Sequence, residues 1–174
     1  MTFALWLVVA AAVCHVFEEY VFPGGFLEAM RRTAPSVAFA VNVPMAVVIN
    51  GLMFVVLLAA AVVGPRAPVF ALSGAALGAV NGWGHVAGTL RRRRYVPGAV
   101  TGLLVYQPVA VLAYLEFAWA GRLSPAVVVG SLLLGVAYHA VPLGYFGTRW
   151  LARRARGAPP IAIDCGNGAA ERGG

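Results

Sequence analysis

The sequence predicts an all-α protein, a polytopic transmembrane bundle of about five helices, and three observations lead to this prediction. The 174 residues are 61% hydrophobic and 11% charged, whereas about a quarter of a typical soluble domain is charged. Five apolar runs each reach about the 20 residues that a helix needs to cross a bilayer. All thirteen basic residues are arginines, and most stand at the ends of these runs. That placement is typical of membrane topology signals and argues against nucleic acid as a partner.

The five predicted spans follow one another without an internal repeat or a second domain. Turn-rich or arginine-rich segments separate them, and residues 26–32 have the pattern of a short interfacial helix with Phe26, Leu27 and Met30 facing lipid. We therefore expect one transmembrane domain over residues 1–156 and a disordered cytoplasmic tail over residues 157–174, which are rich in Gly, Pro and Ala. The spans are Thr2–Phe22, Ser36–Val63, Val69–Leu90, Ala99–Ala120 and Pro125–Trp150.

The arginines also predict how the bundle is oriented. All of them except Arg66 and Arg122 lie in the first loop, in or beside the third loop, or at the end of the last span and after it. Because cytoplasmic loops carry the excess of basic residues, the N-terminus is expected outside and the C-terminus in the cytoplasm. We expect a multi-pass protein of the plasma membrane with membrane lipid as a partner, and a homo-oligomer is compatible with the sequence.

Polar side chains inside the apolar runs point to a site. On a helix, Glu18 and Glu19 follow His15 by three and four residues, so the three side chains can share one face. Counted at about 1.5 Å per residue, polar groups of all five spans reach a similar depth in the cytoplasmic leaflet. Such groups are expensive in hydrocarbon, so their convergence indicates function. They are His15, Glu18, Glu19, Asn42, Asn81, His85, Tyr106, Gln107 and His139.

Each of these residues has a plainer interpretation beside its functional one. A single buried histidine is usually a satisfied core residue, and an asparagine usually makes interhelical hydrogen bonds. Together, imidazoles and carboxylates suit a divalent metal such as Zn, Mn or Fe. The predicted ligands are His15, Glu19, His85 and His139, and the predicted catalytic carboxylates are Glu18 and Glu19. We expect Asn42, Asn81, Tyr106 and Gln107 to support the ligands or orient a substrate.

Two further features of the sequence have structural or binding interpretations. The run Arg91, Arg92, Arg93 and Arg94 is a topology anchor that can also hold an anionic head group. Gly74, Gly78 and Gly82 form a stripe of small residues that predicts close helix packing. Glu116 stands apart, nearer the outer surface, and is left without an assigned role.

Three blocks of the sequence form a recognisable pattern. The first is His15-Val16-Phe17-Glu18-Glu19, followed by Tyr20-Val21-Phe22-Pro23-Gly24-Gly25-Phe26, and the later two are Asn81-Gly82-Trp83-Gly84-His85 and Tyr95-Val96-Pro97-Gly98-Ala99-Val100-Thr101. In these blocks the sequence resembles the HXXEE family of small bacterial membrane proteins. The family has no settled activity, so the resemblance implies a site at His15, Glu18, Glu19 and His85 and does not imply a reaction.

Three classes of function follow from these residues, and the sequence leaves all three open. The first is a membrane-embedded metalloenzyme acting on a lipid or an apolar small molecule, a hydrolase with zinc or an oxidase with iron. The second is a metal-free hydrolase in which a glutamate activates water, although the arginine that such membrane proteases carry after the paired glutamates is missing. The third is a transporter or proton-relay protein, against which stands the lack of an inverted repeat.

Overall fold

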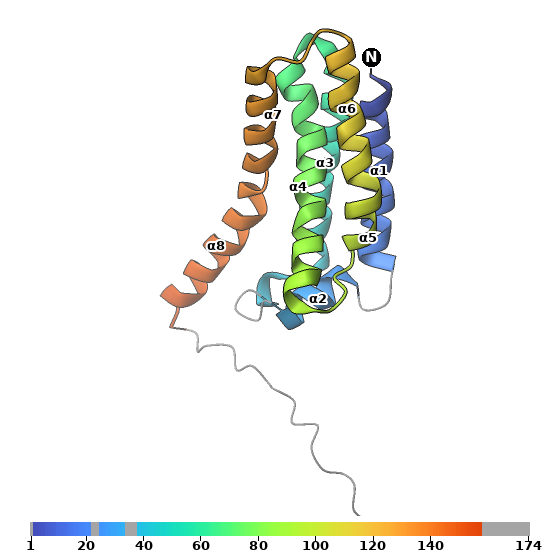
Figure 1. Ribbon diagram of the computed structural model, residues 1–174. Helices are drawn as coiled ribbons and strands as arrows, with labels where there is room; N and C mark the ends of the chain where they lie inside the picture. The colour runs from blue at the N-terminus through green and yellow to red at the C-terminus, as the bar shows by residue number, and fades with distance from the viewer. Residues whose placement is uncertain (1, 22–24, 34–37, 158–174) are drawn as a thin grey trace, which may run out of the picture.

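The computed structural model describes residues 2–21, 25–33 and 38–157, and these residues form helices without any strand. The predicted all-α class is therefore confirmed. Five longer helical stretches stand side by side, and the last of them bends away from the others (Figure 1). The elements are α1 (Phe3–Val21), α2 (Phe26–Thr33), the 3₁₀ turn η1 (Ala38–Ala40), α3 (Val43–Val63), the 3₁₀ turn η2 (Gly64–Arg66), α4 (Pro68–Arg92), α5 (Ala99–Thr101), the π-helical segment η3 (Gly102–Tyr106), α6 (Gln107–Trp119), α7 (Pro125–Ala137) and α8 (Ala140–Ala155).

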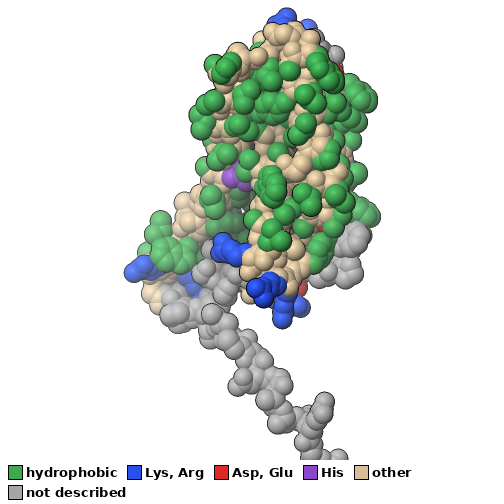
Figure 2. All heavy atoms as spheres, viewed as in Figure 1, with side chains coloured by type: hydrophobic (Ala, Val, Ile, Leu, Met, Phe, Trp, Pro, Cys, Tyr) green, Lys and Arg blue, Asp and Glu red, His purple; other side chains and the backbone are tan. Residues whose placement is uncertain are grey.

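Four of these stretches are long and apolar enough to cross a membrane: α1, α3 with η2, α5 through α6, and α7 with α8. Figure 2 shows hydrophobic side chains along the length of the bundle, with arginines gathered at its ends. The remaining predicted span is α4, which contacts α1, α3, α6 and α7. Glycines, Asn81 and His85 make α4 less apolar than its neighbours. The count of five spans and the outside N-terminus stay predictions.

The glycine stripe of α4 packs as the sequence predicts. A Cβ atom added to Gly74 would lie 3.1 Å from the Ala60 side chain on α3. One added to Gly82 would lie 2.6 Å from the backbone oxygen of Gly102, so only two glycines allow the backbones to approach this closely. This contact brings the start of the α5–α6 span against the half of α4 that carries His85.

The last predicted span, Pro125–Trp150, is broken into two helices. The helical pattern is interrupted at Tyr138 and His139, and α8 then leads away from the bundle (Figure 1). Pro142 explains the break, because it has no N–H to donate to the carbonyl of Tyr138 and its ring crowds that carbonyl. Although α8 leads away from the other long helices, it keeps contact with the start of α3, where Phe146 packs beside Val41 and Met45.

The short helix α2 corrects one expectation. Phe26, Leu27 and Met30 were predicted to face lipid, but they pack against the protein. The Phe26 ring lies 5.5 Å from the His85 ring, and Leu27 and Met30 pack beside Val41. The helix therefore closes one end of the bundle (Figure 1). Of the predicted tail, residues 158–174 lie outside the described residues.

Candidate metal centre

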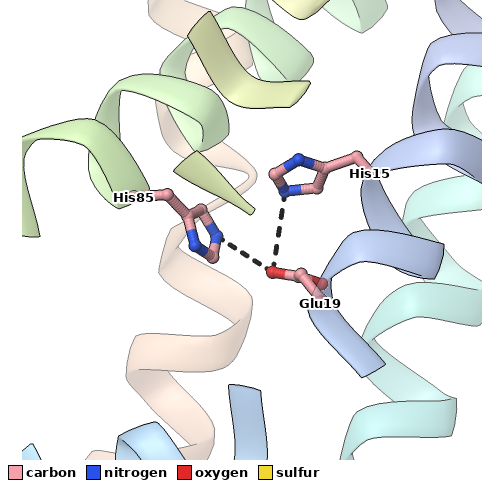
Figure 3. Close-up of side chains that lie close together, drawn as sticks. All are labelled: His15, Glu19 and His85. Atoms are coloured by element: carbon pink, nitrogen blue, oxygen red, sulfur yellow. Dashed lines mark ion pairs between the residues drawn. The ribbon is translucent and has the colours of Figure 1, made fainter. Parts of the chain in front are cut away.

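Three side chains from two helices converge inside the bundle (Figure 3). His15 and Glu19 lie one turn apart on α1, and His85 reaches them from α4. Glu19 Oε1 is 2.9 Å from His85 Nε2 and 3.6 Å from His15 Nε2. The three residues are 0%, 5% and 7% exposed for His15, Glu19 and His85, respectively. Their ligand atoms lie within 4.8 Å of one another, so this group can hold a metal ion.

The hydrogen bonds of His15 determine which of its nitrogens carries the proton. Its Nδ1 lies 2.8 Å from Thr101 Oγ1, and the single hydroxyl proton of Thr101 is donated to the Glu18 carboxylate. Because that proton is already used, Thr101 Oγ1 must accept from Nδ1–H. The Nε2 atom of a neutral His15 therefore carries a lone pair, and this is the nitrogen that faces Glu19.

His85 is held in the same tautomer by the backbone. Its Nδ1 lies 2.6 Å from the carbonyl oxygen of Pro97, which can only accept. The turn that presents this carbonyl continues into Gly98, whose φ of 95° lies in the left-handed region. A Cβ atom on Gly98 would lie 2.8 Å from both His15 Cε1 and His85 Nδ1. A glycine is thus required both by the turn and by the two imidazoles.

These hydrogen bonds leave the Nε2 atoms of both histidines as acceptors beside a carboxylate oxygen. The Asn81 amide already donates to His15 Nε2. His85 Nε2 and Glu19 Oε1, however, lie 2.9 Å apart and are both acceptors when the imidazole is neutral and the carboxylate is ionised, so a proton or a metal cation is needed between these two atoms. Zinc bonds nitrogen and oxygen ligands at about 2.0–2.2 Å, and at tetrahedral or right angles such ligand atoms lie about 3.0–3.5 Å apart. The two distances to Glu19 Oε1, 2.9 and 3.6 Å, bracket that range. The group as a whole extends over 4.8 Å, so the donor types suit a small divalent ion, and the two imidazole nitrogens would move closer together to bind it.

Glu18 faces a different part of the structure from Glu19. Its carboxylate accepts hydrogen bonds from the backbone N–H groups of Gly98, Val100 and Thr101 and from the hydroxyls of Tyr95 and Thr101. Partial burial and the hydrogen bond to Glu18 raise the pKa of Tyr95 to about 12. Since its oxygens are engaged by the start of the α5–α6 span, Glu18 holds that segment, and its catalytic role stays a prediction.

The four residues expected to support the ligands divide into two pairs. Asn81 and Tyr106 lie at the site: Asn81 Nδ2 donates to His15 Nε2 over 3.0 Å, and the Tyr106 ring lies 4.8 Å from the His15 ring. Asn81 therefore occupies the lone pair that a metal would need. Gln107 instead donates to the backbone oxygens of Ala79 and Gly102. Asn42 caps α3 by accepting from the Met45 N–H, so it begins that helix rather than lining the site.

His139 and the arginines lie apart from the three-residue group. His139 lines a neighbouring cavity together with Glu19 and His85, and the compact ligand group does not include it. The bend before α8 accounts for this position, because the depth argument assumed one straight helix. Arg91–Arg94 are exposed at the end of α4, and their binding of an anionic head group stays a prediction.

Four residues around the site were not predicted from the sequence: Pro97, Gly98 and Thr101, which contact the imidazoles, and Tyr95, which donates to Glu18. Their signal was present, because all four belong to the block that resembles the HXXEE family. Another missed feature is the π-helical segment Gly102–Tyr106, a type of irregularity that often occurs at functional sites. Pro108 explains why regular α-helix is disfavoured there, since it supplies no N–H and its ring crowds the carbonyl of Leu104.

Comparison with known proteins identifies a family and nothing more specific. Residues 6–113 match the family described as "Protein of unknown function with HXXEE motif". The matched region includes His15, Glu18, Glu19 and His85, together with the turn around Gly98. No curated protein and no solved structure matches the chain.

Proposed function

The chain belongs to the HXXEE family, and we propose that in this member His15, Glu19 and His85 bind one divalent metal ion, as Zn, Mn or Fe. The observation that carries the proposal is the shared tautomer of the two histidines. Thr101 and the Pro97 carbonyl accept from the two Nδ1–H groups, so the Nε2 atoms of both histidines lie toward Glu19 Oε1, and a metal would take the place of the Asn81 amide at His15 Nε2. Metal-binding histidines commonly donate their second N–H to such oxygen acceptors, which orient the ring.

The proposed ligand set has the composition of two histidines and one carboxylate. This set leaves coordination positions open, so a bound metal would supply Lewis acidity or a redox centre to a reacting molecule. The chain's own contribution is to exclude water and to hold the three donors rigidly, because all three are buried and the imidazoles are fixed at both nitrogens. We propose a hydrolase if the ion is zinc and an oxidase if it is iron.

We further propose that the protein is embedded in the plasma membrane and acts on a lipid or an apolar small molecule. Four helices long and apolar enough to span a bilayer support a membrane location. An apolar cavity bordered by Glu19 and His85 supports an apolar substrate, since it would bring such a molecule to the ligand group. The arginines at the end of α4 support a cytoplasmic position for that end of the bundle.

Metal analysis of the purified protein tests the proposal. We expect the protein in detergent, after incubation with Zn, Mn or Fe(II) and desalting, to retain one ion per chain. His15→Ala and His85→Ala should each lose it, while the control Asn50→Ala, a polar change on α3 outside the ligand group, should keep it. Less than about a tenth of an ion per parent chain, or full retention by the His15→Ala, His85→Ala double variant, would refute the metal site.

A metal-free hydrolase is the second candidate, and one distance favours it. The 2.9 Å between His85 Nε2 and Glu19 Oε1 is an ordinary hydrogen-bond length, so a proton can take the place of the ion. Glu19 would then act as the general base for water, with His85 sharing its proton. A metal-free parent whose hydrolytic activity is lost in Glu19→Gln would support this candidate over the first.

A further inference from the structure

A cavity of about 190 Å³ lies beside the ligand group, between α3, α4 and the bend from α7 to α8. Most of its wall is apolar, with Met45, Ile49 and Met53 on α3 facing Leu77 on α4 and Phe146 on α8. The polar side chains of the lining include Glu19 and His85 of the ligand group and His139 at the helix bend, and the others are Tyr20, Asn50, Asn81 and Tyr138. An apolar wall with a few fixed polar groups is typical of a small-molecule site.

The mouth of the cavity opens toward the side of the bundle. Leu52 on α3 and Val141 on α8 both line it, and they are 50% and 52% exposed. Both belong to stretches that are apolar and long enough to cross a membrane. Glu19 and His85, in contrast, are almost fully buried. The cavity therefore leads from a lipid-facing gap between α3 and α8 inward to the ligand group, and the bend at Pro142 opens that gap.

His139 supplies a hydrogen-bond acceptor that the protein itself does not use. Its Nδ1 lies 3.2 Å from the carbonyl oxygen of Gly135, which can only accept, so Nδ1 carries the proton. Nε2 is then an acceptor in the neutral ring, and it has no hydrogen-bond partner among the described residues. Neighbouring atoms cover this nitrogen, so a small rotation of the ring, which lines the cavity, would present it to a ligand. Leaving a buried polar atom unpaired is unfavourable, and a ligand that donates a hydrogen bond would remove this cost.

We infer that this cavity binds an apolar molecule bearing a hydroxyl group, which enters from the membrane between α3 and α8 and donates a hydrogen bond to His139 Nε2. An engineered cavity of about 150 Å³ holds benzene, so 190 Å³ accommodates about eight heavy atoms, either a whole small alcohol or the end of a longer lipid. The inference deepens the proposed function, on which it rests, by naming the substrate class: an apolar alcohol placed beside Glu19 and His85.

Photolabelling in lipid nanodiscs tests the inference. The probes are a six-carbon alcohol that carries a diazirine ring on its chain and the matching diazirine hydrocarbon without the hydroxyl. We expect the alcohol to label cavity residues of α3 and α8, to be displaced by unlabelled 1-hexanol, and to outcompete the hydrocarbon by about two- to tenfold, the value of one net hydrogen bond. A longer-chain diazirine alcohol distinguishes a lipid end from a free small alcohol, because only a lipid-type ligand should label more strongly as the chain grows.

Two pairs of variants separate the cavity from a general structural effect. Ile49→Trp fills the cavity and should abolish labelling, whereas Val48→Trp, on the 59%-exposed neighbouring position, should not. His139→Phe keeps a ring but removes the acceptor, so the ratio of alcohol labelling to hydrocarbon labelling should fall to about one. His139→Gln retains an acceptor and should restore part of the preference for the alcohol. Equal labelling by both probes in the parent, or an unchanged preference in His139→Phe, would overturn the inference.

Metal content measured on the same samples distinguishes the two proposals. Ile49→Trp and His139→Phe should retain the metal of the parent, because neither residue belongs to the ligand group. If the parent contains no metal but the alcohol probe labels it selectively, the alcohol site is supported and the metal function is refuted. If the parent contains metal but neither probe labels it selectively, the metal site is supported and the alcohol site is refuted.

Discussion

Exchanging each of the paired glutamates for glutamine should have very different effects on thermal stability, although Glu18 and Glu19 are adjacent and both buried. Glu18 is surrounded only by donors: three reach Oε1, from Tyr95, Gly98 and Val100, and two reach Oε2, both from Thr101. A glutamine at this position must turn its NH₂ group toward one of these two sets of donors, and the donors of that set then lose their acceptor. Glu19 faces the Nε2 atoms of two imidazoles, and since Asn81 donates to that of His15, a glutamine at this position gains His85 Nε2 as a suitable acceptor.

The size of the two effects follows from counting these bonds. Glu18→Gln loses at least two hydrogen bonds to a charged group, each worth about 1.5–3 kcal/mol, so the loss is about 3–6 kcal/mol. At about 2–4 °C per kcal/mol for a chain of this size, the midpoint of thermal unfolding should fall by about 6–24 °C. In Glu19→Gln, a hydrogen bond from the glutamine amide replaces the contact between the carboxylate and the histidines. The midpoint of thermal unfolding should therefore stay within about 4 °C of the parent.

The assay is thermal unfolding of both variants in detergent with a chelator present, followed by metal loading. Glu19→Gln should be stable and unable to retain the ion, and Glu18→Gln should be destabilised. If Glu19→Gln lost as much stability as Glu18→Gln, the pair with His85 would be a salt bridge, and our tautomer assignment would be wrong. An unchanged midpoint for Glu18→Gln would show that its hydrogen bonds do not hold the α5–α6 span.

Four other substitutions test separate parts of the structure. Gly98→Ala should reduce metal retention and stability, because the left-handed backbone costs about 1–2 kcal/mol and the new Cβ meets both imidazoles; Gly84→Ala, where nothing lies within 4 Å, should gain about 0.5–1 kcal/mol in thermal unfolding. Asn81→Leu should keep the metal and tighten its affinity by about fivefold in a competition titration, since Asn81 occupies the His15 lone pair; weaker binding would instead make Asn81 a support for the ligands. Glu116→Ala should cost about 0.5–2 kcal/mol, because its carboxylate caps α1 at the Ala4 N–H, and metal content should not change.

Helical spacing was enough to predict the core of the ligand group. His15 and Glu19 are four residues apart and lie on one face of α1, as the period of 3.6 residues requires. The depth count then placed His85 at the same level on another helix, and the structure confirms that the three residues meet. The same count put His139 among the ligands because it treated Pro125–Trp150 as one straight span; the helix is interrupted at Tyr138 and His139, and His139 lines the neighbouring cavity outside the compact ligand group.

The parts that sequence could not supply depend on backbone atoms and on direction around a helix. A carbonyl such as that of Pro97 exists at every residue, so only the folded turn shows that it orients His85. Glu18 and Glu19 lie about 60° to one side and about 40° to the other side of His15 around the helix axis. Spacing puts both near the histidine, but which neighbour each meets depends on how α4 and α5 pack against α1.

The two glutamates of the motif therefore have separate roles, and Thr101 links them because its hydroxyl contacts both Glu18 and His15. The first N–H groups of a helix have no partners within the helix, and they attract a negative charge. Glu18 provides that charge to the start of the α5–α6 span through Gly98, Val100 and Thr101. The same contact uses the Thr101 hydroxyl proton, which leaves Thr101 Oγ1 to accept from His15 and directs the His15 Nε2 lone pair toward Glu19. Capping one helix thus sets the donor direction of a ligand on another, and a loosened cap should release the metal before it unfolds the bundle.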